Sequence, residues 1–358
     1  MTESPPLSTP LTRMVGVRHP IVQTGMGWVA GARLVSATAE AGALGLLASA
    51  TMTLTELERA VVAVKSRTDK PFGVNLRADA TDADDRVSLL IDHGVTVASF
   101  ALAPKPELIG RLKEHGIVVM PSVGAAKHAR KVASWGADIV MVQGGEGGGH
   151  TGPVPTSLLL PQVLDAVDIP VVAAGGYFDG RGLAAALAYG AAGIGMGTRF
   201  LLTAESTVPE QIKRRYLEAG LDGTVVTTKA DGMPHRLLRT DFLRDLEDER
   251  LGHRLRRSVA NAIEFRRSQR IPWRDLLRDG LQMSRSGERT VTQTAMAANT
   301  PMLLKAGLVD GDLSAGMLAS GQVVGVLDDL PTCGELVDRI VAQAAARLDA
   351  LARIRPGS

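Results

Sequence analysis

The stretch PVVAAGGYFDGRGLAAALAYGAAGIGMGTRF, residues 170–200, contains the repeating unit that decides the fold. It begins with an apolar run, PVVAAG (170–175), continues with GRGLAAALAYGA (180–191) and returns to an apolar run, AGIGMG (192–197). The middle segment carries apolar residues at three- and four-residue spacing, which is typical of a helix. The two runs are apolar throughout, as expected of parallel strands that are covered by helices. The stretch therefore predicts a strand, a helix and a second strand.

The same unit recurs along the first half of the chain. Six further apolar runs precede it: PIVQT (20–24), ALGLLAS (43–49), FGVNL (72–76), TVASFA (96–101), IVVMPS (117–122) and DIVMVQ (138–143). Amphipathic helical segments lie between them, so that strand-then-helix units repeat at a spacing of roughly 25 residues. Eight such units predict an α/β protein with a TIM (β/α)8 barrel. The alternative is a doubly wound sheet, but no early run is followed by the Gly-rich dinucleotide fingerprint.

The composition of the chain changes after the eighth run. From Lys213 to Arg278 it is rich in arginine with interspersed acidic residues, reads as helix and shows no clear strand. We therefore expect a barrel at 12–205, an Arg-rich helical insertion or small domain at 206–291, and a C-terminal segment at 292–345 that returns to the barrel mouth. Most of these arginines are expected on a solvated helix face. A few could instead hold the phosphates of a bulky anionic substrate.

Composition also bounds the class of protein. The chain has 358 residues, of which 45% are apolar and 22% are charged, as in a soluble globular protein with a large core. Its one cysteine, Cys333, cannot form an internal disulfide, and the N-terminal stretch lacks the pattern of a secretory signal, so a cytoplasmic location is expected. No apolar run approaches the roughly 18 residues that span a bilayer. A net charge of +2 does not favour nucleic acid or a membrane as partner.

Glycines follow the last two predicted strands. In a TIM barrel the chemistry lies where strands end and helices begin, and the loops after strands seven and eight commonly bind phosphate through backbone N–H groups. Here those loops begin with Gly175-Gly176 and with Gly197-Thr198. The glycines could also serve only to permit tight turns. Because both loops are Gly-rich, we interpret them as a phosphate site.

The loop after the sixth run, VQGGEGGGHTG (142–152), carries the candidate catalytic residue His150. An unperturbed imidazole has a pKa of about 6.5, so it can take up and release a proton within one turnover. The alternative is a histidine that only holds the turn. Glu146 could orient His150 or be solvated, and we expect the second. The other six histidines are expected to be structural or exposed, without a carboxylate partner at metal spacing, so no metal site is predicted.

Five stretches of this chain together resemble the nitronate monooxygenase family, long called 2-nitropropane dioxygenases, which also includes flavin-dependent enoyl-thioester reductases. They are PIVQTGMGWVAG (20–31), GVN (73–75), QGGEGGGHTG (143–152), residues 170–200 and ASGQVVG (319–325). Three further stretches resemble the actinobacterial members that act on coenzyme A (CoA) thioesters in steroid ring degradation. These are VQTGMGWVAGARLVSATA (22–39), DGMPHR (231–236) and MAANTPMLLKAGLVDG (296–311).

The resemblance implies that FMN binds in the barrel and that His150 is the catalytic histidine. The residues implied to contact FMN are Gly25, Met26, Asn75, Ser122, Gln143, Gly148, Gly149, Ala174, Gly175, Gly176, Met196, Gly197, Thr198 and Gln322. The segment from Ser320 to Gln322 matches one that approaches the flavin in the family. Many members carry a lysine at the end of strand five, where this chain has Ser122, with Lys127 a turn later. That departure weighs against nitronate oxidation, because a nearby cation stabilises an anionic substrate.

The activity that the resemblance implies is dehydrogenation of the α,β bond of a hydroxy-methyl-oxo-octahydroindene carboxyl-CoA thioester. His150 would take the α proton, FMN the β hydride, and NAD the electrons in turn. A small-molecule substrate is therefore the expected partner, and a homodimer is left open. Three alternatives stay open: a nitronate monooxygenase that uses O2, a flavin-dependent enoyl-thioester reductase, and a non-catalytic barrel that binds a phosphate ligand.

Overall fold

Eight parallel strands close into a barrel in the computed structural model, which describes residues 7–248 and 299–354. The strands are β1 (Ile21–Gln23), β2 (Leu44–Ala48), β3 (Phe72–Arg77), β4 (Val97–Ala101), β5 (Val118–Val123), β6 (Val140–Gln143), β8 (Val171–Ala174) and β9 (Gly193–Met196). Each pairs with the next, and β1 pairs with β9 to close the barrel. All eight predicted runs fall on these strands, so the TIM barrel prediction is confirmed.

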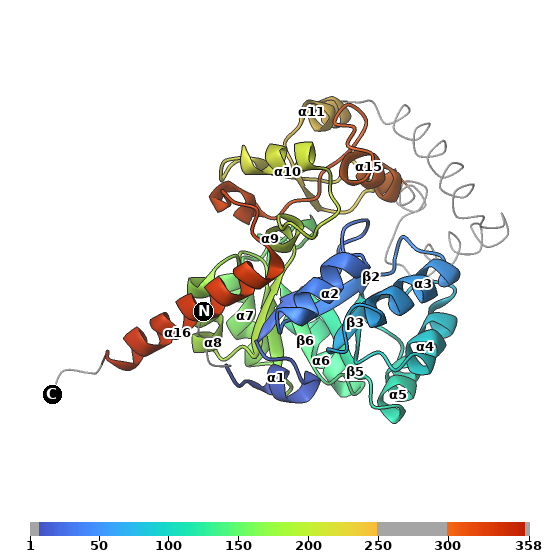
Figure 1. Cartoon of the computed structure of the whole chain (residues 1–358), viewed down its shortest axis with the longest axis vertical. Coiled ribbons are helices and arrows are strands. Elements are labelled where there is room, and N and C mark those ends of the chain that lie inside the picture. The colour runs from blue at the N-terminus through green and yellow to red at the C-terminus, as the bar shows by residue number, and fades with distance from the viewer. Residues whose placement is uncertain (1–6, 249–298, 355–358) are drawn as a thin grey trace.

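Helices form the outer layer around the barrel (Figure 1). They are α2 (Ala32–Glu40), α3 (Leu54–Lys65), α4 (Ala83–Asp92), α5 (Pro106–Glu114), α6 (Ala126–Ser134), α7 (Thr156–Leu164) and α8 (Gly180–Tyr189). Local sequence sets where several begin: Thr53 and Glu56 form a capping box at α3, and the Asp179 side chain caps α8. A short helix, α1 (Pro10–Val15), precedes β1 and packs Leu11 into the cluster of barrel side chains.

The last helix of the chain occupies the eighth place in the helical ring. The helix directly after β9 is α9 (Thr198–Leu201), which is much shorter than the earlier helices of the ring. Instead the long helix α16 (Cys333–Ala352) packs against α8 and α2. The Gly180 N–H donates to the side-chain oxygen of Gln343, and the Thr38 hydroxyl donates to Cys333 Sγ. The C-terminal segment thus completes the ring with its helix, while Gly321 and Gln322, upstream of that helix, donate hydrogen bonds to Thr198 and Glu146.

Between α9 and α16 the chain forms two strands and several helices, and the two strands join β7, from the loop after β6, in a small three-stranded sheet. The strands are β10 (Thr224–Thr227), β11 (His235–Leu238) and β7 (Gly149–His150), in the order β10-β11-β7 and antiparallel. The helices are α10 (Glu210–Leu217), α11 (Asp241–Asp248), α15 (Asn299–Leu308) and the 3-10 helix η1 (Gln322–Val326). Figure 1 shows α10, α11 and α15 gathered on one side of the barrel.

Two strands lie in the segment that was predicted to be helical. The expectation of no clear strand from Lys213 to Arg278 was wrong, because β10 and β11 are four-residue strands stabilised by pairing with each other and with β7, far back in the sequence. The part of the predicted insertion from 249 to 291 lies outside the described residues, so the proposed domain boundaries stay a prediction. Among the described helices, none has the length and apolar character that a membrane span requires.

Candidate active site at the barrel mouth

The Gly-rich loop after β6 is held closely against its surroundings. The Gln143 side-chain amide donates to the His150 carbonyl at 2.9 Å, which ties the two ends of the loop together. A Cβ on Gly147 would lie 2.6 Å from Gln143 Nε2, and a Cβ on Gly148 would lie 2.5 Å from the Gly321 nitrogen. Only glycine allows these approaches. The loop is therefore a packed structural element and not a flexible linker.

Glu146 caps a helix. Its carboxylate accepts the Thr156 N–H at 2.9 Å and the Thr156 hydroxyl at 2.8 Å, at the start of α7. A carboxylate at a helix N-terminus satisfies free N–H groups and interacts favourably with the helix dipole. Both sequence alternatives for Glu146 were wrong, because it neither orients His150 nor is left to solvent.

His150 forms an ion-pair contact with Asp231. Its Nε2 lies 2.7 Å from Asp231 Oδ2, and the Asp231 side chain is 2% exposed whereas that of His150 is 49% exposed. Burial alone would raise the pKa of Asp231, but the hydrogen bond and charge of His150, together with the Met233 N–H, hold it below its ordinary value. Asp231 is therefore a carboxylate at neutral pH. Because a carboxylate only accepts hydrogen bonds, the hydrogen of neutral His150 lies on Nε2, and Nδ1 carries the lone pair that can accept a proton.

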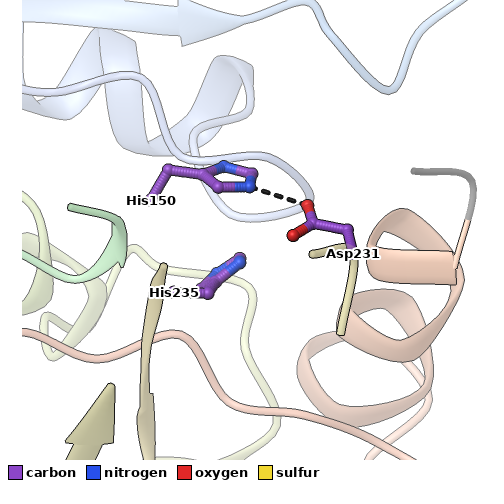
Figure 2. Close-up of side chains that lie close together, drawn as sticks. All are labelled: His150, Asp231 and His235. Carbon is purple, nitrogen blue, oxygen red and sulfur yellow. Dashed lines mark hydrogen bonds and ion pairs between the residues drawn. The ribbon is translucent and has the colours of Figure 1, made fainter. Parts of the chain in front are cut away.

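His235 lies against the same pair. Its ring centroid is 4.6 Å from that of His150, at an interplanar angle of 44°. Burial lowers the pKa of His235 to about 3, so its ring is neutral at neutral pH. Within the described part of the chain neither of its ring nitrogens has a hydrogen-bond partner. Figure 2 shows the His235 ring opposite the hydrogen bond between His150 and Asp231.

Sequence reasoning missed Asp231 and His235. The expectation that no histidine has a carboxylate partner was wrong, since the ligand atoms of His150, Asp231 and His235 all lie within 4.8 Å of one another. Asp231 is 81 residues from His150 in the chain, and the pairing of β7 with β11 brings them together. The signal in the sequence was an aspartate and a histidine four residues apart in DGMPHR, a short Gly- and Pro-containing stretch. It stood in a segment whose composition suggested helix.

Several of the residues implied to bind FMN meet at the mouth of the barrel. A Cβ on Gly25 would lie 2.5 Å from Asn75 Cβ, and a Cβ on Gly197 would lie 3.5 Å from Met26 Sδ. The Thr198 hydroxyl accepts the Gly321 N–H at 2.8 Å. The loop after β1 is therefore close to Asn75 on β3 and to the loop after β9, which in turn contacts the segment before η1.

The remaining implied residues also lie at or near the ends of barrel strands. Ser122 is in register with Ala101 and Met141, Ala174 with Gln143 and Gly195, and Met196 with Gln23. Gly149 lies on β7, and exposed Gln322 begins η1, where its N–H donates to the Glu146 carbonyl at 2.9 Å. Lys127, by contrast, is exposed in the first turn of α6.

The loop after β8 leaves backbone groups accessible, whereas the loop after β9 starts the buried first turn of α9. Gly175 and Gly176 have φ of +94° and +85°, a conformation that favours glycine. A Cβ on Gly176 would have no neighbour nearer than the Glu146 side chain at 3.8 Å, so there is open space in front of this backbone. The first-turn N–H groups of α9, from Thr198 on, have no partner within the helix. N–H groups at the start of a helix and open space before a glycine backbone are two features that favour an anion such as a phosphate.

An open hollow of about 500 Å³ lies beside the loop, lined by residues that include Pro153, Pro234 and Gln322. Arg236 also lines it, and its guanidinium donates to the Gly145 carbonyl at 2.8 and 3.1 Å. The hollow therefore combines apolar walls with one positive and one negative group, Arg236 and Glu146, close to the strand that carries His150.

Comparisons with known proteins support the sequence resemblance. A model of the nitronate monooxygenase family matches residues 8–88 and 80–343. A Mycobacterium tuberculosis protein named (3aS,4S,5R,7aS)-5-hydroxy-7a-methyl-1-oxo-octahydro-1H-indene-4-carboxyl-CoA dehydrogenase is 68% identical over 345 residues, which cover 96% of this chain and 97% of that protein. A Rhodococcus jostii protein with the same name is 66% identical over 349 residues, covering 98% and 99%.

Solved structures with the same architecture point in the same direction. FabK from Thermotoga maritima superimposes with a TM-score of 0.78 and 33% identity, covering 97% of this chain and 99% of that one. A nitroalkane oxidase from Streptomyces ansochromogenes has a TM-score of 0.75 and 29% identity, covering 96% and 100%. The fold is thus shared along nearly the whole length of each chain.

Proposed function

Because this chain belongs to the nitronate monooxygenase family, whose members are flavin-dependent oxidoreductases, we propose that it dehydrogenates a CoA thioester. The proposed substrate is the CoA thioester of a hydroxy-methyl-oxo-octahydroindene carboxylic acid, as in the names of two relatives at 66% and 68% identity. The observation that carries the proposal is the pair formed by His150 and Asp231, which provides a base for the acidic α hydrogen of a thioester.

We propose that the flavin is FMN and that its phosphate lies on the loops after β8 and β9. The open space before Gly176 and the first-turn N–H groups of α9, which have no partner within the helix, suit an anion, so the residues present fit the cofactor. The rest of the FMN molecule would then lie along Gly25, Met26 and Asn75. Bound there, FMN supplies an acceptor for the hydride that leaves the β carbon of the thioester.

His150 would act as the base through Nδ1. The thioester carbonyl acidifies the α hydrogen, and an imidazole can remove it near neutral pH. Asp231 keeps the hydrogen of His150 on Nε2 and stabilises the imidazolium that forms when Nδ1 takes the α proton. Loss of the α proton and the β hydride leaves an α,β-unsaturated thioester. Asp231 is thus a positioning residue, which acts on the substrate only through His150.

The loop around His150 suits the approach of a bulky acyl group. Among the residues that the structure describes, a Cβ on Gly152 would meet nothing within 4 Å and one on Gly149 would meet His235 Nε2 at 3.8 Å, so space is open beside His150. The adjacent hollow offers room to the polar arm of the thioester, and its wall carries the Arg236 guanidinium as well as the Glu146 carboxylate. NAD is the proposed final electron acceptor.

Nitronate oxidation is the second candidate, because a probable nitronate monooxygenase of Staphylococcus saprophyticus is 30% identical over 72% of this chain. Ser122 at the end of β5, where many such enzymes carry lysine, weighs against it. Enoyl-thioester reduction is the same chemistry run in the opposite direction. Family membership leaves the non-catalytic barrel without support.

An anaerobic titration followed by visible absorption separates these activities. We expect the thioester to bleach the flavin band of the purified protein and NAD to restore it. Bleaching by NADH with no response to the saturated thioester would identify a reductase. Bleaching by propyl nitronate alone, with oxygen consumption on exposure to air, would identify a nitronate monooxygenase. Either outcome would overturn the proposal.

A further inference from the structure

We infer that His150, Asp231 and His235 form a site for a divalent transition-metal ion, with Zn²⁺ as the best match, and that a bound ion inhibits the enzyme. Two imidazoles and one carboxylate are the donor set of open zinc sites with three protein ligands. The candidate ligand atoms all lie within 4.8 Å of one another, so small side-chain movements would bring them around one ion. Figure 2 shows the three side chains converging from separate segments.

His235 supplies the second observation. Its side chain is buried, at 2% exposure, yet neither ring nitrogen has a hydrogen-bond partner within the residues that the structure describes. Buried polar atoms in folded proteins nearly always have a hydrogen-bond partner. The two ring nitrogens of His235 are therefore candidates for binding a ligand. The neutral imidazole of His235 is directed at the carboxylate of Asp231 and at the imidazole of His150. These three groups together are donors that a zinc ion requires.

The neighbouring residues leave the site open on one side. The Asp231 carboxylate is fixed by a backbone hydrogen bond: its Oδ1 accepts the Met233 N–H at 3.0 Å, while its Oδ2 faces His150. The nearest arginine in sequence, Arg236, donates its guanidinium to the Gly145 carbonyl and to the Thr224 hydroxyl. The His150 side chain is half exposed, which gives an ion a path to the ligands.

Metal binding and base catalysis exclude each other at this site. An ion on Nε2 of His150 needs the lone pair of that nitrogen, so the hydrogen of the neutral ring moves to Nδ1. Nδ1 is the nitrogen that the proposed function uses as the base. The ion also takes the carboxylate of Asp231, which then no longer stabilises an imidazolium. Zn²⁺ would therefore switch the enzyme off reversibly, and a chelator would restore it.

Isothermal titration calorimetry of the tag-free holoenzyme with ZnCl2 tests the site without relying on activity. We expect one tight site per chain in the wild type. H235F keeps an aromatic ring in place but removes the ligand, and it should weaken that site by at least about 100-fold. H150A removes a half-exposed ligand and should do the same with little effect on folding. H128F, at an exposed position on α6, is the matched control and should bind as the wild type does.

Activity measurements then test inhibition. We expect Zn²⁺ to abolish wild-type thioester dehydrogenation and EDTA to restore it, whereas the activity that H235F retains should not respond to Zn²⁺ at the same concentration. No tight site in the wild type, or equal binding by the wild type, H235F and H150A, would overturn the inference. Since calorimetry requires no turnover, a protein that lacks dehydrogenase activity but binds zinc through His235 would contradict only the proposed function.

Discussion

Nε2 of His150 and Oδ2 of Asp231 lie 2.7 Å apart although the two residues are 81 positions apart in the chain. His150 belongs to the loop after the sixth barrel strand, and Asp231 to the segment that follows the barrel. The contact depends on the pairing of β7 with β11, which places the second segment against the mouth of the barrel. The site is therefore shared between the barrel and the small sheet, and neither part holds it alone.

Replacing His150 with alanine should lower the kcat of thioester dehydrogenation by about 100- to 10,000-fold, the range that a general base contributes. The flavin content should be unchanged, because the proposed phosphate site lies on the loops after β8 and β9. Stopped-flow reduction of the flavin by the thioester measures the effect. H128A, on the exposed face of α6, serves as the control. Undiminished flavin reduction in H150A would contradict the role of His150.

Replacing Asp231 with asparagine tests its role as a positioning residue. The amide of asparagine can donate to Nε2 of His150, so the hydrogen of the ring would move to Nδ1 and the base would be lost. We expect kcat to fall by about 100-fold or more, with KM and flavin content close to those of the wild type. D222N, at an exposed position before β10, is the control. A rise in KM with unchanged kcat would indicate a role in substrate binding instead.

The barrel could be predicted from the sequence, because its signal is local. Each of the eight strands is a short apolar run, and each is followed by a segment with helical spacing or by a Gly-rich turn. The same local reading failed after the barrel, where β10 and β11 have four residues each and depend on long-range pairing. The β-branched residues of β10 (TVVT) favour a strand, whereas β11 (HRLL) does not differ in composition from the predicted helical segment around it.

Only part of the candidate site could be predicted from the sequence. His150 stood out because it follows a predicted strand end within a glycine loop, and the sequence could place it at the barrel mouth. Its partner could not be found in this way, since nothing local to Asp231 or His235 reveals which loop they meet. Glu146 shows the converse error: it is close to His150 in sequence, yet its carboxylate caps α7 through Thr156. Proximity along the chain was a poor guide to contact here.

Gly176 offers a test of the proposed FMN phosphate site. Its φ of +85° and the open space before it suggest that the backbone there approaches the phosphate, so G176A should weaken FMN binding by at least about tenfold. The matched control is G190A, since Gly190 has a φ of +103° at the end of α8 and only the Leu164 side chain near it. Both variants carry backbone strain, but only G176A should lose flavin. Fluorescence titration of the apoprotein with FMN measures this, and equal affinity in the two variants would argue against the site.

Burial of His235 should make the protein less stable in mild acid. Its pKa falls from an ordinary 6.5 to about 3 in the folded protein, so between these values the unfolded chain binds a proton that the folded chain does not. The contribution of neutral His235 to the free energy of unfolding is therefore fully present above about pH 6.5, and it is lost as the pH falls towards 3. The expected loss is about 2 kcal/mol in the free energy of unfolding at about pH 5.

Urea unfolding at several pH values, with EDTA present to remove metal ions, measures this loss. H235F cannot titrate, so its stability should change less than that of the wild type between about pH 7.5 and pH 5. H128F keeps the buried histidine and should follow the wild type. If H235F and the wild type lost stability in parallel over this range, other groups would account for the acid sensitivity, and His235 would not be the neutral buried ring that the structure describes.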